Sequence, residues 1–194
     1  MQLSNQLTSR KDMSMCFDQT LTEVVLDPGE YFVGGADFKV RTLLGSCVAM
    51  VLWHPRMRYG AMSHFLLSSR ESSKDIREMR GAEVKLLHLD GKYADEVLEL
   101  MMRELRRANV PLHECVAKVF GGGNMFPQQK MADNLNVGKK NGETAKRLLR
   151  DLGFRIVAED LFGNGHRQVI FNVCNGDVWS KQDNQFANHF TSPT

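Results

Sequence analysis

The sequence predicts an α/β (α+β) fold in which strands and helices pack in layers. Short apolar stretches bounded by glycine fill the first third of the chain, which is typical of strands. Two amphipathic stretches follow, each long enough for a helix and each followed by a further strand-like stretch. The order of strands, helix, strand, helix and strands is typical of α+β or mixed α/β layers. We therefore expect one domain, and the 194 residues contain no repeat.

The first half of this domain is expected to be mostly sheet. Short strands are predicted at residues 30–33 and 38–43, on either side of a pair of glycines. Residues 48–53 form an apolar run suited to a buried strand, and residues 59–67 predict another strand after the turn at 54–56. We expect these last two strands to form an antiparallel hairpin.

The second half alternates helices with strands. Apolar residues spaced by three and four predict an amphipathic helix over residues 93–108. A strand at 115–120 ends in three glycines, and a second helix at 136–152 stops at Gly153, a residue favoured just after a helix C-terminus. Late strands are expected at 154–158 and 168–173, joined by a Gly-Asn-Gly turn.

The remaining segments are polar. Residues 1–21 lack clear periodicity and are expected to form a poorly ordered tail, as are residues 182–194, which leaves 22–181 as the domain. Residues 68–89 are rich in serine and charge and predict an exposed loop. Such a loop beside a reactive site is a candidate contact for a partner.

Composition excludes several classes of function. The 25 Lys and Arg residues nearly balance the 23 Asp and Glu residues, so bulk charge gives no reason to expect nucleic-acid binding. There is no secretory signal and no run of about 18 apolar residues, so we expect a cytoplasmic protein without direct membrane insertion. The four cysteines form no C-x-x-C pair, which predicts free thiols with no metal site and no disulfide framework.

The strongest chemical signal is Cys47, which follows Gly45 and Ser46 in a predicted turn. Small residues before a cysteine leave room for a substrate carbonyl and expose backbone N–H groups that can receive an oxyanion. The predicted hairpin brings Cys47, at the start of one strand, near His64, at the end of the next. A nucleophile beside a base indicates covalent hydrolysis.

Each residue also has a structural interpretation. A cysteine beside an apolar strand is more often a buried core residue, and a histidine among apolar neighbours is more often a hydrogen-bonded structural group. The glycines at 121–123 lack the Lys-Ser/Thr of a phosphate loop, so they indicate a turn or a close backbone approach. The basic residues of the second helix indicate a solvated face.

Six ordered motifs together resemble the CheD family of chemoreceptor glutamine deamidases. Residues 44–48 (Leu-Gly-Ser-Cys-Val) and 60–64 (Gly-Ala-Met-Ser-His) are similar to the family's cysteine and histidine signatures. Thr42 is the nearest match to the threonine of the family's Cys-His-Thr site, one position closer to the cysteine than in the family pattern. Further family-like blocks stand at residues 92–95, 120–126, 136–141 and 158–160, the last followed by Arg167.

The resemblance implies a layered α/β sandwich similar to that of deamidating cysteine toxins. It implies Cys47 as nucleophile, His64 as base, Thr42 as the residue that orients His64, and the backbone at Gly45 and Ser46 as part of the oxyanion site. No cofactor is expected. The implied substrates are glutamines in the cytoplasmic helical region of methyl-accepting chemotaxis receptors, and a CheC-type phosphatase is a further expected partner.

Two alternatives remain open on the sequence alone. The chain could act as a non-catalytic binding module that docks on chemoreceptors or on a CheC-type phosphatase. It could also be another cysteine amidohydrolase or a transglutaminase with an unrelated protein substrate. Cys47 and His64 together favour catalysis over binding alone.

Overall fold

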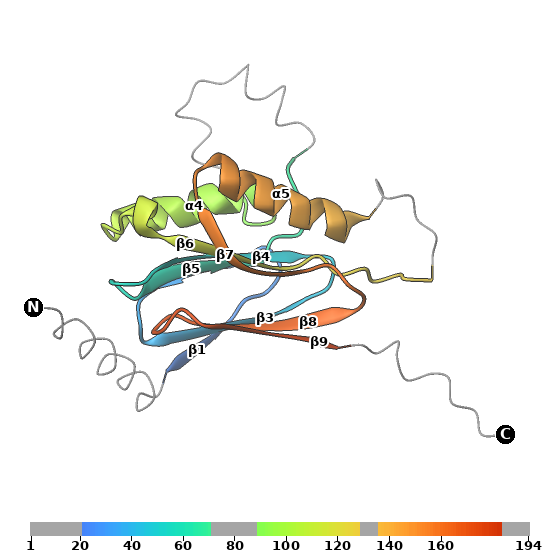
Figure 1. Cartoon of the computed structure of the whole chain (residues 1–194), viewed down its shortest axis with the longest axis horizontal. Helices are drawn as coiled ribbons and strands as arrows, with labels where there is room; N and C mark the ends of the chain where they lie inside the picture. The colour runs from blue at the N-terminus through green and yellow to red at the C-terminus, as the bar shows by residue number, and fades with distance from the viewer. Residues whose placement is uncertain (1–20, 71–88, 129–135, 184–194) are drawn as a thin grey trace, which may run out of the picture.

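The computed structural model describes residues 21–70, 89–128 and 136–183, and these residues form a three-layer α/β/β arrangement (Figure 1). Two helices cover one face of a five-stranded sheet, and a four-stranded sheet packs on the other face of that sheet. The fold class predicted from the sequence is confirmed. Most of the predicted tails and most of the predicted loop at 68–89 lie outside the described residues, but Gln182 and Asp183, which were predicted to start the C-terminal tail, belong to a strand, β9 (Val178–Asp183).

The five-stranded sheet has the order β2-β5-β4-β6-β7. Its first three pairings are antiparallel and the last, between β6 and β7, is parallel. Its strands are β2 (Tyr31–Gly34), β4 (Val48–His54), β5 (Tyr59–Ser63), β6 (Val116–Gly121) and β7 (Arg155–Leu161). The predicted hairpin of residues 48–53 and 59–67 is present as β4 and β5, although β5 ends before His64.

The four-stranded sheet has the order β1-β3-β8-β9, with β1 parallel to β3 and the other pairs antiparallel. Its strands are β1 (Thr22–Val25), β3 (Phe38–Leu44), β8 (His166–Asn172) and β9 (Val178–Asp183). Neither β1 nor β9 was predicted as a strand. Both are edge strands whose outward residues are exposed, so they lack the long apolar run that marks a buried strand.

The helices are α4 (Ala94–Arg107) and α5 (Val137–Asp151), with a short 3₁₀ turn η2 (Leu112–Glu114) after α4. In α5 the side chain of Asn136 accepts a hydrogen bond from the Lys139 backbone N–H at 3.0 Å, which caps the helix N-terminus. Gly153 follows the helix with φ of +80°, as its predicted position after the C-terminus requires.

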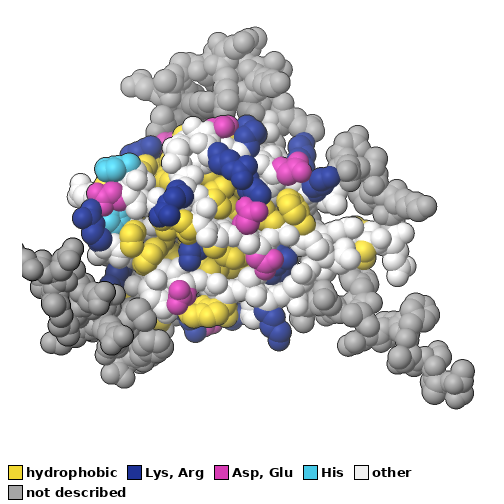
Figure 2. All heavy atoms as spheres, in the orientation of Figure 1, with side chains coloured by type: hydrophobic (Ala, Val, Ile, Leu, Met, Phe, Trp, Pro, Cys, Tyr) yellow, Lys and Arg dark blue, Asp and Glu magenta, His cyan; other side chains and the backbone are white. Residues whose placement is uncertain are grey.

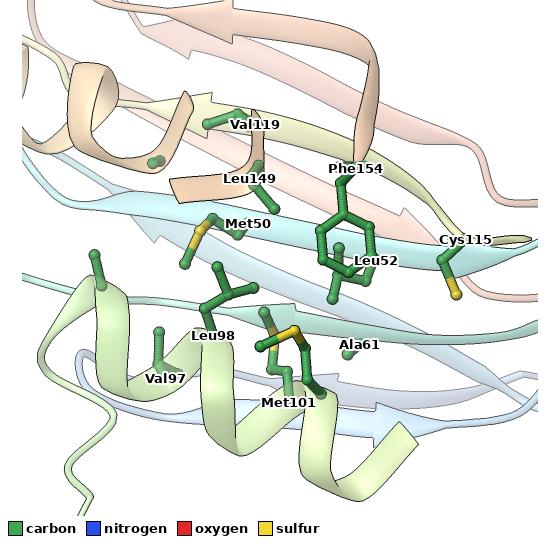
Figure 3. Close-up of a cluster of buried hydrophobic side chains, with 14 of the residues drawn as sticks. Met50, Leu52, Ala61, Val97, Leu98, Met101, Cys115, Val119, Leu149 and Phe154 are labelled. Atoms are coloured by element: carbon green, nitrogen blue, oxygen red, sulfur yellow. The ribbon is translucent and has the colours of Figure 1, made fainter. Parts of the chain in front are cut away.

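Two hydrophobic clusters fill the two spaces between the layers. Figure 3 shows the first cluster, in which side chains of α4 such as Leu98 and Met101 lie near Met50 and Leu52 of β4. The second cluster lies between the two sheets and includes Val51. Strand β4 is therefore buried on both faces, which explains why its sequence is continuously apolar rather than alternating.

The three glycines at the end of β6, Gly121 to Gly123, permit a close approach of α5. Gly121 and Gly122 have φ of +115° and +68°, and a Cβ on Gly122 would lie 2.6 Å from the carbonyl oxygen of Gly138. A Cβ on Gly138 would likewise lie 2.5 Å from the Gly122 oxygen. The interpretation of these glycines as a site of close backbone contact is confirmed. It brings the first turn of α5 against the end of β6.

Candidate active site

The turn that carries Cys47 joins β3 in one sheet to β4 in the other. Its three carbonyl oxygens each accept a hydrogen bond. Gly45 accepts from Gly123 N–H at 2.8 Å and Cys47 accepts from Gly122 N–H at 2.8 Å. Between them, the oxygen of Ser46 accepts from the side chain of Asn141 at 3.2 Å. The glycine segment after β6 and one side chain of α5 thus hold the whole turn in place.

Cys47 is a free, half-buried thiol that packs against the hydrophobic cluster between the two sheets. Burial raises the pKa of the Cys47 thiol above its ordinary value of 9.0, and the residue's own backbone N–H partly opposes that shift by favouring the thiolate. The Cys47 thiol is therefore protonated near neutral pH. A base is needed before it can act as a nucleophile.

His64 lies directly after β5, and its side chain is only 2% exposed. Val48 and Phe65 form a mutual backbone pair with N–O distances of 3.1 and 3.0 Å, and both of these side chains point toward the helices. Successive residues alternate between faces, so Cys47 and His64 both face the second sheet. Cys47 packs against the cluster between the two sheets, and His64 contacts Thr42 of the second sheet, so the two side chains share that space.

Thr42 meets His64 from the opposite sheet. It lies on the inner face of β3 with 3% exposure, and its Oγ1 is 2.7 Å from His64 Nδ1 and 2.8 Å from the backbone oxygen of Leu26. A carbonyl oxygen only accepts, so the threonine hydroxyl donates its single proton to Leu26. In the contact between Thr42 Oγ1 and His64 Nδ1, the imidazole must therefore be the donor, so Nδ1 carries a proton.

This arrangement fixes the tautomer of His64. With the proton on Nδ1, the lone pair of the imidazole is on Nε2, a buried atom that has no hydrogen-bond partner in the structure. Burial lowers the pKa of His64 below its ordinary value of 6.5, opposed in part by the Leu26 backbone and by the charges of Asp27 and Glu30. The imidazole is therefore neutral near pH 7 and able to accept a proton at Nε2.

The sequence analysis assigned no role to Asn141, which the structure places between the cysteine turn and the histidine segment. Its side-chain N–H groups donate to the oxygens of Ser46 and Leu66, and its oxygen accepts from the hydroxyl of Ser68. Ser68 is 8% exposed, contrary to the prediction that it starts an exposed loop. Two signals in the sequence marked this position: the family-like block at residues 136–141 ends at Asn141, and asparagine is a poor residue for a helix interior.

A cavity of about 350 Å³ borders the turn on the side of Gly122. It is open to solvent and is lined by three asparagines, Asn124, Asn136 and Asn164, together with Lys139 and Phe162. The cavity therefore offers amide and ammonium groups next to the backbone that holds Cys47.

The two other cysteines that the structure describes lie away from this site. Cys115 is buried beneath the helices, and burial raises the pKa of its thiol to about 11, so it is unreactive (Figure 3). Cys174 is disulfide-bonded, contrary to the expectation that all four cysteines are free thiols.

In the described part of the chain, no group of three or more His, Cys, Asp or Glu side chains is placed to hold a metal ion. None of the helices described is both long and apolar enough to cross a bilayer. Figure 2 shows Lys and Arg side chains interspersed with Asp and Glu on the face it displays, not gathered into one basic surface.

Comparisons with known proteins point to one family. Residues 79–182 match the CheD family, described as CheD chemotactic sensory transduction. A probable chemoreceptor glutamine deamidase CheD 2 from Albidiferax ferrireducens is 51% identical over 160 residues, which cover 82% of this chain and 87% of that protein. A protein named CheD 1 from Chromobacterium violaceum is 37% identical over 84% of this chain and 78% of its own length. One from Pseudomonas savastanoi pv. phaseolicola is 39% identical, with 82% and 84% covered.

Proposed function

The chain belongs to the CheD family, as its motifs predicted, and from this premise we propose that it is a chemoreceptor glutamine deamidase. Its relatives are named as probable enzymes of that kind. The observation that carries the proposal is the hydrogen bond of 2.7 Å between Thr42 and His64, which leaves His64 Nε2 unpaired on the face that it shares with Cys47. Cys47, His64 and Thr42 act as nucleophile, base and orienting residue.

The reaction starts from a neutral thiol and a neutral imidazole, because burial shifts both pKa values toward the uncharged forms. His64 Nε2 takes the proton of Cys47 as the sulfur attacks the side-chain amide carbon of a substrate glutamine. Backbone N–H groups of Ser46 and Cys47 receive the negative oxygen of the tetrahedral intermediate. Thr42 keeps the imidazole in the required tautomer.

The intermediate then collapses to products in two steps. The carbon–nitrogen bond breaks, the proton on His64 passes to the departing nitrogen, and ammonia leaves a thioester on Cys47. Water gives a proton to His64 Nε2 and adds to the thioester, after which the carbon–sulfur bond breaks and the thiol regains the proton. The sum converts glutamine and water to glutamate and ammonia, with no cofactor.

Substrate and location follow from the family. The substrates are specific glutamines of the cytoplasmic helical region of methyl-accepting chemotaxis receptors, so the protein works in the cytoplasm. Each conversion adds a negative charge to the receptor and creates a carboxylate that can be methylated. A CheC-type phosphatase is the second partner in this proposal.

The experiment is mass spectrometry of a chemoreceptor cytoplasmic fragment after incubation with this protein or with its Cys47→Ala variant. We expect individual glutamines to gain the mass that accompanies exchange of an amide for a carboxyl group, and only with the intact cysteine. Deamidation by the Cys47→Ala variant would exclude the covalent route. No conversion of any cognate receptor, with binding retained, would indicate a binding module instead.

A further inference from the structure

Asn141 is an almost completely enclosed polar side chain beside the turn. It is 1% exposed, on the second turn of α5, and every hydrogen-bonding group of its amide faces a partner. Its Nδ2 lies 3.2 Å from the oxygen of Ser46 and 2.6 Å from that of Leu66, and its Oδ1 lies 3.1 Å from Ser68 Oγ. One side chain thus links the cysteine turn to the segment that follows His64.

The hydrogen bond from Asn141 to the Ser46 oxygen also fixes the direction of the Cys47 N–H, because of the geometry of the peptide bond. The carbonyl of Ser46 and the N–H of Cys47 belong to one planar trans peptide, so they point in opposite directions. Asn141 holds the carbonyl on the α5 side, which directs the Cys47 N–H away from α5.

The neighbouring peptides are held in the same way. The N–H of Gly123 donates to the carbonyl oxygen of Gly45. That carbonyl and the N–H of Ser46 belong to one planar peptide, so fixing the carbonyl also fixes the direction of the Ser46 N–H. Within the described residues, the N–H groups of Ser46 and Cys47 donate to no other group. Both are therefore available to a ligand, while the carbonyls behind them are fixed. Asn141 is the one side chain in this set of anchors.

We infer that Asn141 is a positioning residue that sets the direction of the oxyanion donors at Ser46 and Cys47. The inference rests on the proposed function, because it concerns the same site. Without the Asn141 side chain, the Ser46–Cys47 peptide loses its anchor and can rotate, so the Cys47 N–H spends less time directed at the oxyanion. Removing one oxyanion donor outright lowers kcat by about 10²–10³, and we expect loss of the anchor alone to lower it by about 10- to 100-fold.

The test compares two reactions of Cys47 that differ in one respect. Acylation by p-nitrophenyl acetate passes through an oxyanion, whereas alkylation by iodoacetamide does not. Both are measured for the full chain and for Asn141→Ala, with release of p-nitrophenol as one readout and peptide mass spectrometry of alkylated Cys47 as the other. Receptor deamidation gives kcat and KM in parallel.

Matched variants separate positioning from general damage. Asn141→Asp keeps the shape of the side chain but turns an acceptor toward two carbonyl oxygens, and it serves if Asn141→Ala does not fold. Ser68→Ala removes only the partner of the Asn141 oxygen. Asn172→Ala removes another buried asparagine, whose oxygen accepts from Cys174 N–H in the β8–β9 turn.

We expect Asn141→Ala and Asn141→Asp to lower the ratio of acylation to alkylation by about tenfold or more, with kcat for deamidation falling and KM nearly unchanged. Ser68→Ala and Asn172→Ala should leave the ratio within about twofold of the unaltered protein, because neither touches Ser46. An equal loss of both reactions, or no loss of either, would overturn the inference. If the unaltered protein deamidates no receptor, the proposed function fails, but the ratio still decides the role of Asn141.

Discussion

Two buried histidines stand at opposite ends of the β4–β5 hairpin, and only one is arranged as a base. His54 ends β4 and His64 follows β5, and each is 2% exposed with no hydrogen bond at Nε2. His54 Nδ1 accepts from the Met57 backbone N–H at 3.1 Å, so its proton is on Nε2, which faces the carboxylate of Glu114 at 3.3 Å. His64 has the reverse tautomer, because Nδ1 donates to Thr42.

Burial and residue type are therefore not sufficient to make a histidine side chain a base. Both imidazoles are enclosed equally, yet one presents an N–H to a carboxylate and the other presents a lone pair on the face that carries a thiol. The difference comes from the partner at Nδ1, a backbone donor for His54 and a hydroxyl that has already donated its proton for His64.

The largest effect is expected from replacing each histidine by glutamine. His64→Gln should lower kcat for receptor deamidation by about 10²–10⁴, because the proton acceptor for Cys47 is lost. His54→Gln should keep kcat and lower the free energy of unfolding by about 1–3 kcal/mol, since it disturbs a buried polar contact. Initial rates and denaturant unfolding measure the two effects, and an equal loss of kcat in both variants would contradict the distinction.

The pH dependence of Cys47 reactivity should reflect a neutral pair. The pKa of the thiol lies above 9.0 and that of His64 below 6.5, so thiolate is scarce at neutral pH. Alkylation by iodoacetamide should rise about tenfold per pH unit below the thiol pKa, with no plateau near pH 7. Deamidation should lose rate only as pH falls through the His64 pKa. A neutral plateau in alkylation would instead reveal a preformed thiolate–imidazolium pair.

Thr42→Val should lower kcat by roughly 10- to 100-fold, less than loss of the histidine itself. Valine keeps the shape of threonine but removes the acceptor that holds the proton on His64 Nδ1, so the wrong tautomer becomes populated. Thr42→Ser keeps the hydroxyl and should retain kcat within about threefold. Steady-state rates test both variants, and thermal unfolding confirms that they fold. Equal activity of the valine and serine variants would show that the tautomer is set elsewhere.

The smallest effect is expected at the His54 end. Glu114 contacts both His54 and the exposed Arg56, and the hydrogen bond from Arg56 is the main reason that the pKa of Glu114 is lowered. Glu114→Gln should leave kcat unchanged and shift the midpoint of thermal unfolding by less than about 3 °C, because solvent screens such a pair. A loss of deamidation in this variant would mean that the two ends of the hairpin are coupled.

Local pattern predicted most of the elements, though not β1 and β9, and it marked Cys47 and His64 as the candidate nucleophile and base. The apolar runs of β4 and β5 predicted the hairpin, and the spacing of apolar residues predicted α4 within one residue at each end. His64 was expected inside a strand that ran to residue 67. In the structure β5 ends at Ser63, although the His64 backbone still pairs with the turn before β2 through Glu30 O and Gly29 N.

Long-range pairing was not predictable from the same patterns. Strands β7 and β8 follow one another in the chain, yet they belong to different sheets. The buried Arg167 links the two sheets. It lies on β8 of one sheet, and its guanidinium donates to the backbone oxygens of Gly121, Asp160 and Phe162, which lie on or next to strands of the other sheet. An arginine that is 3% exposed has no local signal, because its partners are carbonyl groups that every residue possesses.

Periodicity and residue type in the chain predict the layered α/β class, the hairpin and the candidate nucleophile and base, and the family resemblance adds Thr42. How these residues are held in place depends on packing between distant segments. Thr42 reaches His64 from the other sheet, and Asn141 reaches Ser46 from a helix 95 positions along the chain. The direction of a hydrogen bond depends on atoms brought together by packing, and no local pattern in the chain encodes it.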